Sequence, residues 1–223
     1  MSRILIGTPF KDMASSGYIK SLANLIAYTV AQGHEVHYTS QHGGLYNARD
    51  RICRLTVRGN YDYMLQIDSD QTFPEDALCK MLDRDLDVCT GIYVGGEAEH
   101  KPVLFTELFK DSGNECAHAS KKGLTELLKE DVFEVAGAGA GFLLVRQHLL
   151  RLMWIHQHEW FKPYEGLGED VSFCQRVREL GFKIFADNTF RVGHIKYIIQ
   201  TMDDWTGLED ELIREAENDE EET

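Results

Sequence analysis

The clearest structural signal in this chain is the stretch Tyr61-Asp-Tyr-Met-Leu-Gln-Ile-Asp-Ser-Asp70. Up to Asp68 it carries a nearly continuous apolar run, as expected for a strand with both faces of its sheet covered. Asp68 and Asp70 then leave the carboxyl end of that strand. In open α/β sheets, ligands bind beyond the carboxyl ends of the strands. The stretch therefore predicts a buried strand that delivers two carboxylates to a binding site.

Strand and helix patterns alternate on both sides of this stretch. The strand-like runs cover residues 3–9, 35–39 and 86–93, and the helical patterns cover residues 19–30, 48–55 and 74–82. Such β-α-β alternation predicts a parallel sheet flanked by helices.

The second half of the chain predicts more strands with fewer helices between them. Strand-like runs cover residues 103–109, 132–136, 142–145, 183–186 and 190–195, and helices are expected over 147–153 and 168–180. A polar stretch over 111–122 is expected to be an excursion loop, and 154–168 an ordered surface loop rich in aromatic residues. Together the halves predict an α/β fold with a mostly parallel central sheet, flanking helices and a smaller mixed sheet in the second half.

Length and composition fit one globular domain with a tail. The 223 residues are 43% hydrophobic and 27% charged, so the chain can bury a sizeable core without disulfides. Its longest nearly apolar run, 135–145, is about half of the ~20 residues that a membrane-spanning helix needs. The N-terminus lacks the cleavage site of a signal peptide. Five scattered cysteines without a C-x-x-C motif indicate reduced thiols and a cytoplasmic protein.

The net charge of −14 is concentrated at the C-terminal end. Residues 203–223 hold eleven acidic residues and one basic residue, a local charge of −10. We therefore expect a single domain over residues 1–202, followed by a solvated, flexible acidic tail. The domain itself carries −4 and no block of basic residues. It encodes no broad electrostatic attraction to nucleic acid or anionic lipid.

The first candidate site is Asp68-Ser69-Asp70. A bend at Ser69 would let one or both carboxylates reach a shared divalent cation, and oxygen ligands suit Mg²⁺ or Mn²⁺. A bridging cation would also make this acidic pair compatible with a diphosphate. The alternative interpretation is that the two aspartates only cap a turn before the helix at Pro74.

The second candidate is Gly166-Leu-Gly-Glu-Asp170, which opens a predicted helix. Acidic residues are favoured in the first turn of a helix, so capping by Glu169 or Asp170 is the simpler interpretation. The functional interpretation is that one carboxylate takes a proton from an acceptor hydroxyl.

The third candidate is His194, near the end of the last predicted strand. A lone histidine is more often structural or exposed. A neutral imidazole could nevertheless complete a metal site begun by the aspartates. A nitrogen ligand among oxygen ligands favours Mn²⁺ over Mg²⁺.

These motifs follow one another in an order typical of one family. Together with Thr8-Pro9 at the end of the first strand, Ala48-Arg49-Asp50-Arg51 at a helix start and the glycine-rich segment 137–141, they resemble a GT-A glycosyltransferase. The chain looks close to the family 2 type, and it is most similar to the compact versions found in phages and prophages. The resemblance covers residues 3–196.

The resemblance implies a role for each motif. It implies nucleotide contacts from Thr8, Pro9, Arg49 and Asp68, although Asp50 stands where the family usually has asparagine. It places the backbone of Gly139, Ala140 and Gly141 beside the donor sugar. It implies metal ligands in Asp70 and His194, with Asp68 beside them, and an acidic pair, Glu169 and Asp170, whose Asp170 is the general base of an inverting transfer.

The resemblance also implies the ligands of the protein. They are Mn²⁺ or Mg²⁺ and a nucleotide-diphosphate sugar, in the first place a UDP-sugar. The acceptor is expected against Trp160 and Tyr164 of the aromatic loop, although aromatic residues in such loops are more often core or loop anchors. A glycan, a virion protein and a hydroxylated DNA base all stay open as acceptors. A phage-encoded protein of this kind would act in the host cytoplasm without stable membrane insertion.

Two other functions compete with this one. A sugar nucleotidyltransferase would also use carboxylates and a metal, but it normally carries a glycine-rich basic loop after the first strand, unlike Gly7-Thr-Pro-Phe-Lys-Asp12. A GT-A domain without catalytic activity could serve as a binding scaffold. The presence of both aspartates, the Glu-Asp pair and His194 in one chain argues against such a loss of activity.

Overall fold

The computed structural model describes residues 1–10, 13–95, 101–110, 117–164 and 166–196. The strands are β1 (Arg3–Phe10), β2 (Glu35–His42), β3 (Tyr63–Ile67), β4 (Gln71–Thr72), β5 (Val88–Gly91), β6 (Leu104–Phe105), β7 (Glu107–Lys110), β8 (Ala117–Ser120), β9 (Val132–Val135), β10 (Gly137–Ala138), β11 (Phe142–Arg146), β12 (Ile184–Asp187) and β13 (Gly193–His194). The helices are α1 (Ser16–Ala31), α2 (Leu45–Arg58), α3 (Ala77–Asp83), α4 (Leu124–Leu127), α5 (Gln147–Gln157) and α6 (Glu169–Glu179). The predicted acidic tail over 203–223 lies outside the described residues.

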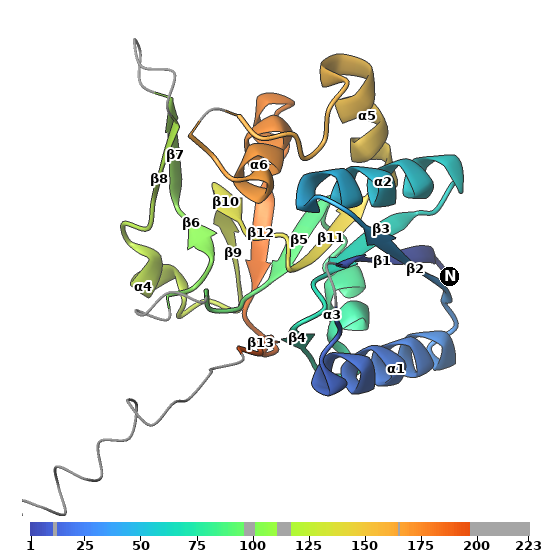
Figure 1. The fold of residues 1–223 in the computed structure, drawn as a ribbon. Helices are drawn as coiled ribbons and strands as arrows, with labels where there is room; N and C mark the ends of the chain where they lie inside the picture. Colours follow the sequence, from blue (N-terminus) through green and yellow to red (C-terminus); the bar gives the residue numbers. More distant parts are fainter. Residues whose placement is uncertain (11–12, 96–100, 111–116, 165, 197–223) are drawn as a thin grey trace, which may run out of the picture.

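Seven strands form one central sheet in the order β2-β1-β3-β11-β5-β12-β9 (Figure 1). β1 pairs in parallel with β2 and β3, and β12 pairs in parallel with β5. β11 is antiparallel to both β3 and β5, and β9 is antiparallel to β12. Five of the seven strands thus run in one direction, which confirms the predicted α/β fold with a mostly parallel central sheet.

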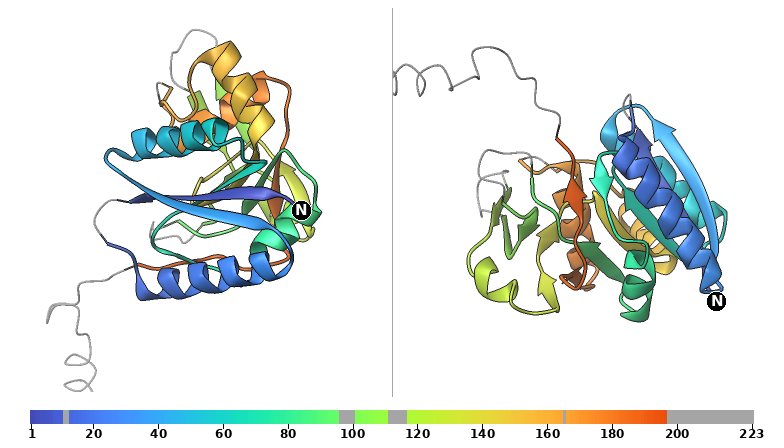
Figure 2. Two further views of the ribbon diagram at one scale, coloured as in Figure 1. Left: turned by 90° about the vertical axis from the view of Figure 1, so that its right-hand side faces the viewer. Right: turned by 90° about the horizontal axis from the view of Figure 1, so that it is seen from below.

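Helices cover both faces of this sheet. α1 and α3 lie on one face, and α2, α5 and α6 lie on the other (Figures 1 and 2). β3 shows how the sequence produces this arrangement, because its side chains alternate between the two faces. Leu65 and Ile67 pack in the core under α1 and α3, whereas Met64 packs in the core under α2 and α5. A strand buried on both faces needs the continuous apolar run that the sequence shows.

The second half differs from the sequence-based expectation in its pairing. β11, β12 and β9 join the central sheet itself, and the smaller sheets are two-stranded ribbons, β10 with β6, β13 with β4, and β7 with β8. The predicted strand over 190–195 is reduced to β13, and the predicted loop over 111–122 contains β8. Residues 111–116 lie outside the described part. The prediction missed β8 because a short polar strand becomes recognisable only through its partner β7.

Two helices that lead to the candidate site begin at glycines. Gly44 is the N-cap of α2 and Gly168 is the N-cap of α6, and neither helix has a side-chain cap. Gly43 has a φ of +118°, a backbone conformation that favours glycine, so the chain can turn sharply from β2 into α2.

Within the described ranges, no helix combines the length and the apolar character needed to cross a bilayer.

Candidate active site

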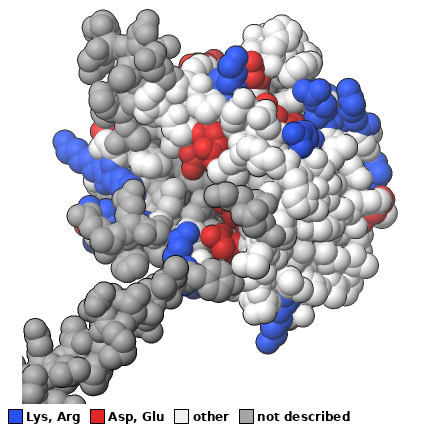
Figure 3. All heavy atoms as spheres, in the orientation of Figure 1, with Lys and Arg blue, Asp and Glu red and all other residues white. Residues whose placement is uncertain are grey.

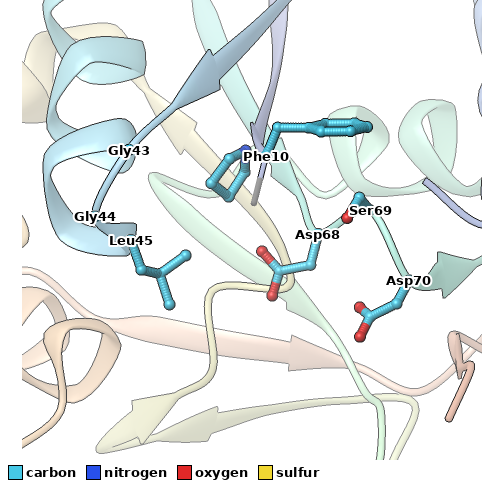
Figure 4. A pocket seen from close by; sticks show the side chains of 8 residues that line it. Phe10, Gly43, Gly44, Leu45, Asp68, Ser69 and Asp70 are labelled. Atoms are coloured by element: carbon cyan, nitrogen blue, oxygen red, sulfur yellow. The ribbon is translucent and has the colours of Figure 1, made fainter. Parts of the chain in front are cut away.

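The segment Asp68-Ser69-Asp70 turns sharply at the end of β3. The amide of Asp68 donates to the carbonyl of Gly141 at 2.9 Å, and the amide of Gln71 donates to the carbonyl of Asp68 at 3.2 Å. Ser69 is tied to the start of α1, because its carbonyl accepts from the amide of Ser15 at 3.1 Å. The turn directs the carboxylates of Asp68 and Asp70 to the same side (Figure 4).

These two carboxylates line a cavity of about 410 Å³. A volume of this order suits a small ligand or part of a larger one. Its other walls come from the end of β1, from the start of α2 with the turn before it, and from the turn after β3. These residues are Pro9, Phe10, Gly43, Gly44, Leu45 and Ser69 (Figure 4). The cavity therefore lies beyond the carboxyl ends of β1 and β3, where the sequence predicted a binding site.

His194 is the partner of Asp70. β13 pairs with β4, and the amide of Ile195 donates to the carbonyl of Asp70 at 2.7 Å, so the two backbones are held side by side. The Nε2 atom of His194 lies 3.1 Å from Oδ2 of Asp70, and Lys196 Nζ lies 3.5 Å from the same oxygen. Burial would raise the pKa of Asp70, but the hydrogen bond and charge of His194 and the charge of Lys196 hold this pKa below its ordinary value. The bond to Asp70 raises the pKa of His194.

The chemistry of this pair fits a divalent cation. Nδ1 of His194 lies 2.8 Å from the carbonyl oxygen of Val94, which can only accept, so Nδ1 carries a proton. In the neutral imidazole, Nε2 then presents a lone pair to the carboxylate of Asp70, and two acceptors in contact need a proton or a cation between them.

The protein supplies only part of a coordination shell here. Across the described residues, no group of three or more His, Cys, Asp or Glu side chains could hold a metal ion. Mg²⁺ is commonly bound through one or two carboxylates together with substrate phosphates and water. Asp70 and His194, with Asp68 beside them, fit a cation of that kind.

Arg49 lies beneath the site and is almost fully buried. Its Nη2 donates to both oxygens of Asp68, at 2.9 and 3.2 Å, and its Nη1 donates to Gln66 Oε1 at 3.0 Å and to the carbonyl of Ala140 at 3.1 Å. Its Nε lies 3.5 Å from Oε1 of Glu169. Burial lowers the pKa of Arg49, but the carboxylates of Asp68 and Glu169 outweigh burial and raise it above the ordinary value. One buried cation thus joins the two acidic motifs.

Asp170 follows Glu169 in the first turn of α6. Its Oδ1 accepts from the amide of Val171 at 2.7 Å. Burial, and then the negative charge of Glu169, raise the pKa of Asp170 to about 6, while Arg49 lowers it. The charge of Asp68 also raises the pKa of Asp170, so the two acidic motifs share one electrostatic environment. A carboxylate with this pKa is suited to accept a proton near neutral pH.

Several solved structures share this fold. The chain is similar to A197 from STIV (18% identity, 87% of this chain and 86% of that one, TM-score 0.56). It is also similar to GalNAc-T7 with UDP, GalNAc and Mn²⁺ (11% identity, 92% of this chain and 45% of that one, TM-score 0.53). A third similar structure is S. aureus TarS with UDP-GlcNAc (12% identity, 91% of this chain and 61% of that one, TM-score 0.50). The chain has the GT-A fold. It spans about half the length of the GalNAc-T7 structure and three fifths of the TarS structure. Comparison by sequence finds no matching protein-family model and no matching curated protein.

Thr8 and Arg49, two residues for which the resemblance implies nucleotide contacts, are both buried. The Thr8 side chain is fully buried and its hydroxyl is bonded to that of Tyr18, whereas Pro9 lines the cavity. The guanidinium of Arg49 is 3% exposed and is joined to the cavity wall through its bonds to Asp68. Asp50 accepts from the amide of Phe161 at 2.8 Å and anchors the loop after α5.

The glycines of the 139–141 segment make room for Tyr93. A Cβ on Gly139 would collide with the Tyr93 hydroxyl, and a Cβ on Gly141 would lie 2.8 Å from a ring carbon of Tyr93. Their amides already have protein acceptors, Val103 carbonyl at 3.0 Å for Gly139 and Tyr93 hydroxyl at 3.1 Å for Gly141. The predicted contact of these amides with a donor sugar would need those bonds to change.

The aromatic loop is more buried than the sequence predicts. Trp160 is 2% exposed, its ring nitrogen donates to the carbonyl of Leu150 at 2.9 Å, and it stacks on Trp154. This burial favours the alternative interpretation, in which Trp160 is a core anchor of the loop. Tyr164 is half-buried, with the guanidinium of Arg176 4.1 Å from its ring centroid and its hydroxyl donating to Glu179 at 3.0 Å.

Three side chains that shape the site were not predicted from the sequence. Tyr93 lies edge-on to His194, with 5.6 Å between ring centroids, and fixes the backbone at Gly141. Lys196 brings a positive charge to Asp70, and Gln66 holds Arg49 from the α2 face of β3. Only Lys196 had a usable signal, since it follows His194 by two residues. The others become recognisable only in three dimensions.

Proposed function

We propose that this chain is a metal-dependent glycosyltransferase that moves a sugar from a nucleotide-diphosphate donor, in the first place a UDP-sugar, to an acceptor hydroxyl. The proposal rests above all on the contact between His194 and Asp70, which lines a cavity together with Asp68. The GT-A fold supports it, because GalNAc-T7 and TarS, which share that fold, were solved with UDP or UDP-GlcNAc.

Asp70 and His194 would hold the cation, with Asp68 beside them. When bound, the cation would neutralise the diphosphate and act as a Lewis acid on its oxygens. The cavity between Pro9, Phe10 and Leu45 would receive the nucleotide, since its walls are largely apolar and its carboxylates lie at one side.

Asp170 is the proposed general base. It takes the proton of the acceptor hydroxyl while the hydroxyl oxygen forms a bond to the anomeric carbon of the sugar. The bond from that carbon to the diphosphate oxygen breaks, and the nucleoside diphosphate leaves with the electron pair. This direct displacement inverts the anomeric configuration. A positioned general base contributes about 10²–10⁴ in rate.

Thermal stabilisation by donor is the first test. The full chain is heated with UDP-, GDP-, CDP- and TDP-sugars, with and without Mn²⁺. A ligand at 100 times its Kd stabilises the folded state by about 2.7 kcal/mol, which corresponds to roughly 5–10 °C in Tm for a protein of this size. We expect such a shift for one donor only when Mn²⁺ is present, followed by sugar transfer to a member of a glycan, protein and DNA panel.

Asp70→Asn should abolish the metal-dependent part of this shift. Asp76→Asn is a matched control, because the two side chains are similarly exposed, 36% for Asp70 and 33% for Asp76, and each faces a cation. Equal donor binding by Asp70→Asn and wild type in Mn²⁺ would contradict the assigned cation site. Release of free diphosphate from a nucleoside triphosphate and a sugar phosphate would indicate a nucleotidyltransferase instead.

A further inference from the structure

β2 leaves one edge of the central sheet open. It is the outermost strand, and Figure 2 shows α1 and α2 on the two faces beside it with no described element across its outer edge. It has eight residues in an unbroken register with β1. The opposite edge strand, β9, has only four residues. A long open edge is a pairing site for another strand unless something blocks it.

The backbone groups on this edge belong to three residues. The amide of Glu35 donates to the carbonyl of Ser2 at 3.0 Å, so the backbone groups of Glu35 point toward β1. Successive residues of a strand point their backbone groups to alternate sides, so Val36, Tyr38 and Ser40 point theirs away from the sheet. In the part of the chain that the structure describes, these N–H and C=O groups have no hydrogen-bond partner.

β2 lacks the residues that usually protect an open edge. Its sequence, Glu-Val-His-Tyr-Thr-Ser-Gln-His, contains no lysine, proline or glycine. Its one carboxylate, Glu35, is paired with Arg3 at 3.2 Å. Protected edges are blunted by lysines, prolines, bulges or a covering element. By this measure, β2 is built to be paired rather than to face water.

The helix beside this edge is apolar on its outer side. Lys20 is the only charged residue among the sixteen of α1, although 27% of the whole chain is charged. Ile19 is 58% exposed and Val30 is 50% exposed, and Ala23 is exposed on the same side of the helix. Surface helices normally carry charged or polar residues on their outer face. The outer side of α1 therefore has the composition of a covered surface.

This apolar stripe of Ile19, Ala23 and Val30 faces the β2 edge. The opposite flank of α1 packs toward β4, because the hydroxyl of Ser21 accepts from the amide of Phe73 at 3.2 Å. At 100° per residue, the stripe lies roughly opposite Ser21. In Figure 3 the lower right of the molecule, where Figure 1 places α1, shows few Lys, Arg, Asp or Glu side chains. We call β2 and the apolar stripe together the β2–α1 edge.

We propose that the β2–α1 edge is the interface of a homodimer, in which β2 pairs antiparallel with β2 of a second copy about a two-fold axis at Tyr38. Val36 of each copy then lies opposite Ser40 of the other, so the free backbone groups of all three residues are used. Glu35 lies opposite Gln41, so no like charges meet.

A second copy fits this edge for two further reasons. The two-fold axis stands perpendicular to the joined sheet, so the apolar stripes of the two α1 helices come to lie on the same face. An isologous contact also closes on itself, because each copy covers the open edge of the other. The eight residues of β2 and the stripe are fewer than the about 20–30 per partner of a standard interface, so we expect a Kd of about 1–100 µM. This proposal does not depend on the proposed transferase activity.

Sedimentation of the full chain over about 1–300 µM tests the dimer. We expect a monomer–dimer equilibrium. Ile19→Lys places one ammonium from each copy in the interface and should raise the Kd at least about tenfold, because like charges brought together are costly. Ile155→Lys is the matched control, since Ile155 is a similarly exposed isoleucine, 62% against 58% for Ile19, and lies on α5. Its Kd should stay within about twofold of wild type.

Hydrogen exchange on the wild-type chain identifies the occupant of the edge. The amides of Val36, Tyr38 and Ser40 should become protected as the protein concentration rises through the Kd. Ser40→Pro removes one of these amides without touching a bond from β2 to β1, and it should keep the chain monomeric. The exchange measurement needs no variant, so it decides the matter even where a substitution disturbs folding.

Three results would overturn the proposal. The first is a wild-type chain that stays monomeric at about 300 µM. The second is protection of these amides that does not change with concentration, because a segment of the same chain would then pair with the edge. The third is a dimer that both Ile19→Lys and Ser40→Pro leave intact, because its interface would then lie elsewhere on the molecule.

Discussion

Arg49 holds Asp68 with two hydrogen bonds from a single nitrogen, 2.9 Å to Oδ1 and 3.2 Å to Oδ2. The same guanidinium lies 3.5 Å from the carboxylate of Glu169, beside the proposed base Asp170. Charge-assisted pairs of this kind are directional, so the position of each carboxylate depends on the arginine. The geometry of the two acidic motifs, which come from distant parts of the sequence, is therefore set by one buried side chain.

Loss of the Arg49 guanidinium should destabilise the protein strongly. Arg49→Met leaves Asp68 and Glu169 without their cation, and breaking a buried ion pair typically costs about 3–5 kcal/mol. Urea unfolding measures this cost. Arg51→Met, one half-turn away on the exposed side of α2, is the control and should cost less than about 1 kcal/mol. Equal midpoints for both variants would contradict the central role of Arg49.

The pH dependence of transfer should report Asp170. Its pKa is raised to about 6, so the free carboxylate that accepts the proton is lost as the pH falls through that value. We expect kcat/KM to fall about tenfold per pH unit below pH 6 and to level off above it. Glu169→Gln removes the neighbouring negative charge that raises this pKa, and it should move the acid limb to lower pH. If Glu169→Gln leaves the acid limb of the pH profile in place, that limb reports the titration of a group other than Asp170.

Asp170→Asn should abolish transfer and stabilise the fold. Folding raises the pKa of Asp170 from 3.8 to about 6, so ionisation opposes folding. The penalty is absent below about pH 4, where folded and unfolded states are both protonated, grows between pH 4 and 6, and is full above pH 6. We expect Asn to raise the free energy of unfolding by about 1–3 kcal/mol at pH 7.5 and by little at pH 4. A variant that is no more stable than wild type at pH 7.5 would show that the buried charge carries no such penalty.

The fold could be predicted from sequence where one strand or helix carries its own pattern. β3 reads as a strand buried on both sides, and α1, α2 and α6 show their apolar spacing directly, so the α/β class and mostly parallel sheet were predictable. The insertion of β11 between β3 and β5 was not, because strand pairing is decided by side chains from three separate segments. The two-residue strands β4 and β13 carry no pattern of their own.

The candidate site was predictable where a motif is local. Asp68, Asp70 and His194 were identified from short stretches, and the structure brings Asp70 and His194 together. For Trp160, an acceptor contact and a buried loop anchor were both open from the sequence, because an aromatic residue between turn residues fits either, and the structure shows that it is buried. Burial depends on α5 and α6 packing over the loop, and one sequence does not show that contact.

Gly139 should be required because the Tyr93 side chain leaves no space for a Cβ at this position, and not because the backbone must be flexible there. Gly139→Ala would push a methyl group into the Tyr93 hydroxyl, and overpacking of this kind costs about 1–3 kcal/mol. Tyr93→Phe removes that hydroxyl but also the acceptor of the Gly141 amide. In a double-mutant cycle by urea unfolding, we expect the combined loss to be smaller than the sum of the single losses. Strict additivity would show that the Tyr93 hydroxyl is not what excludes a side chain at 139, and would leave that role to Val103, whose Cγ1 would lie 2.8 Å from the new Cβ, and to the Tyr93 ring.

His194 should set which metal the site prefers. An imidazole nitrogen favours Mn²⁺, whereas an all-oxygen set suits Mg²⁺, so we expect wild type to be stabilised with donor more strongly by Mn²⁺ than by Mg²⁺. His194→Asp replaces the nitrogen ligand by oxygen while keeping a short side chain beside Asp70. The ratio of donor affinity in Mn²⁺ to that in Mg²⁺ should then fall by about tenfold, whatever the loss of absolute affinity. His148→Asp is the control, since His148 is exposed on α5 and should leave the ratio unchanged. An unaltered ratio in His194→Asp would place the cation away from His194, and the convergence of Asp70 and His194 would then be only an ion pair that holds β13 against β4.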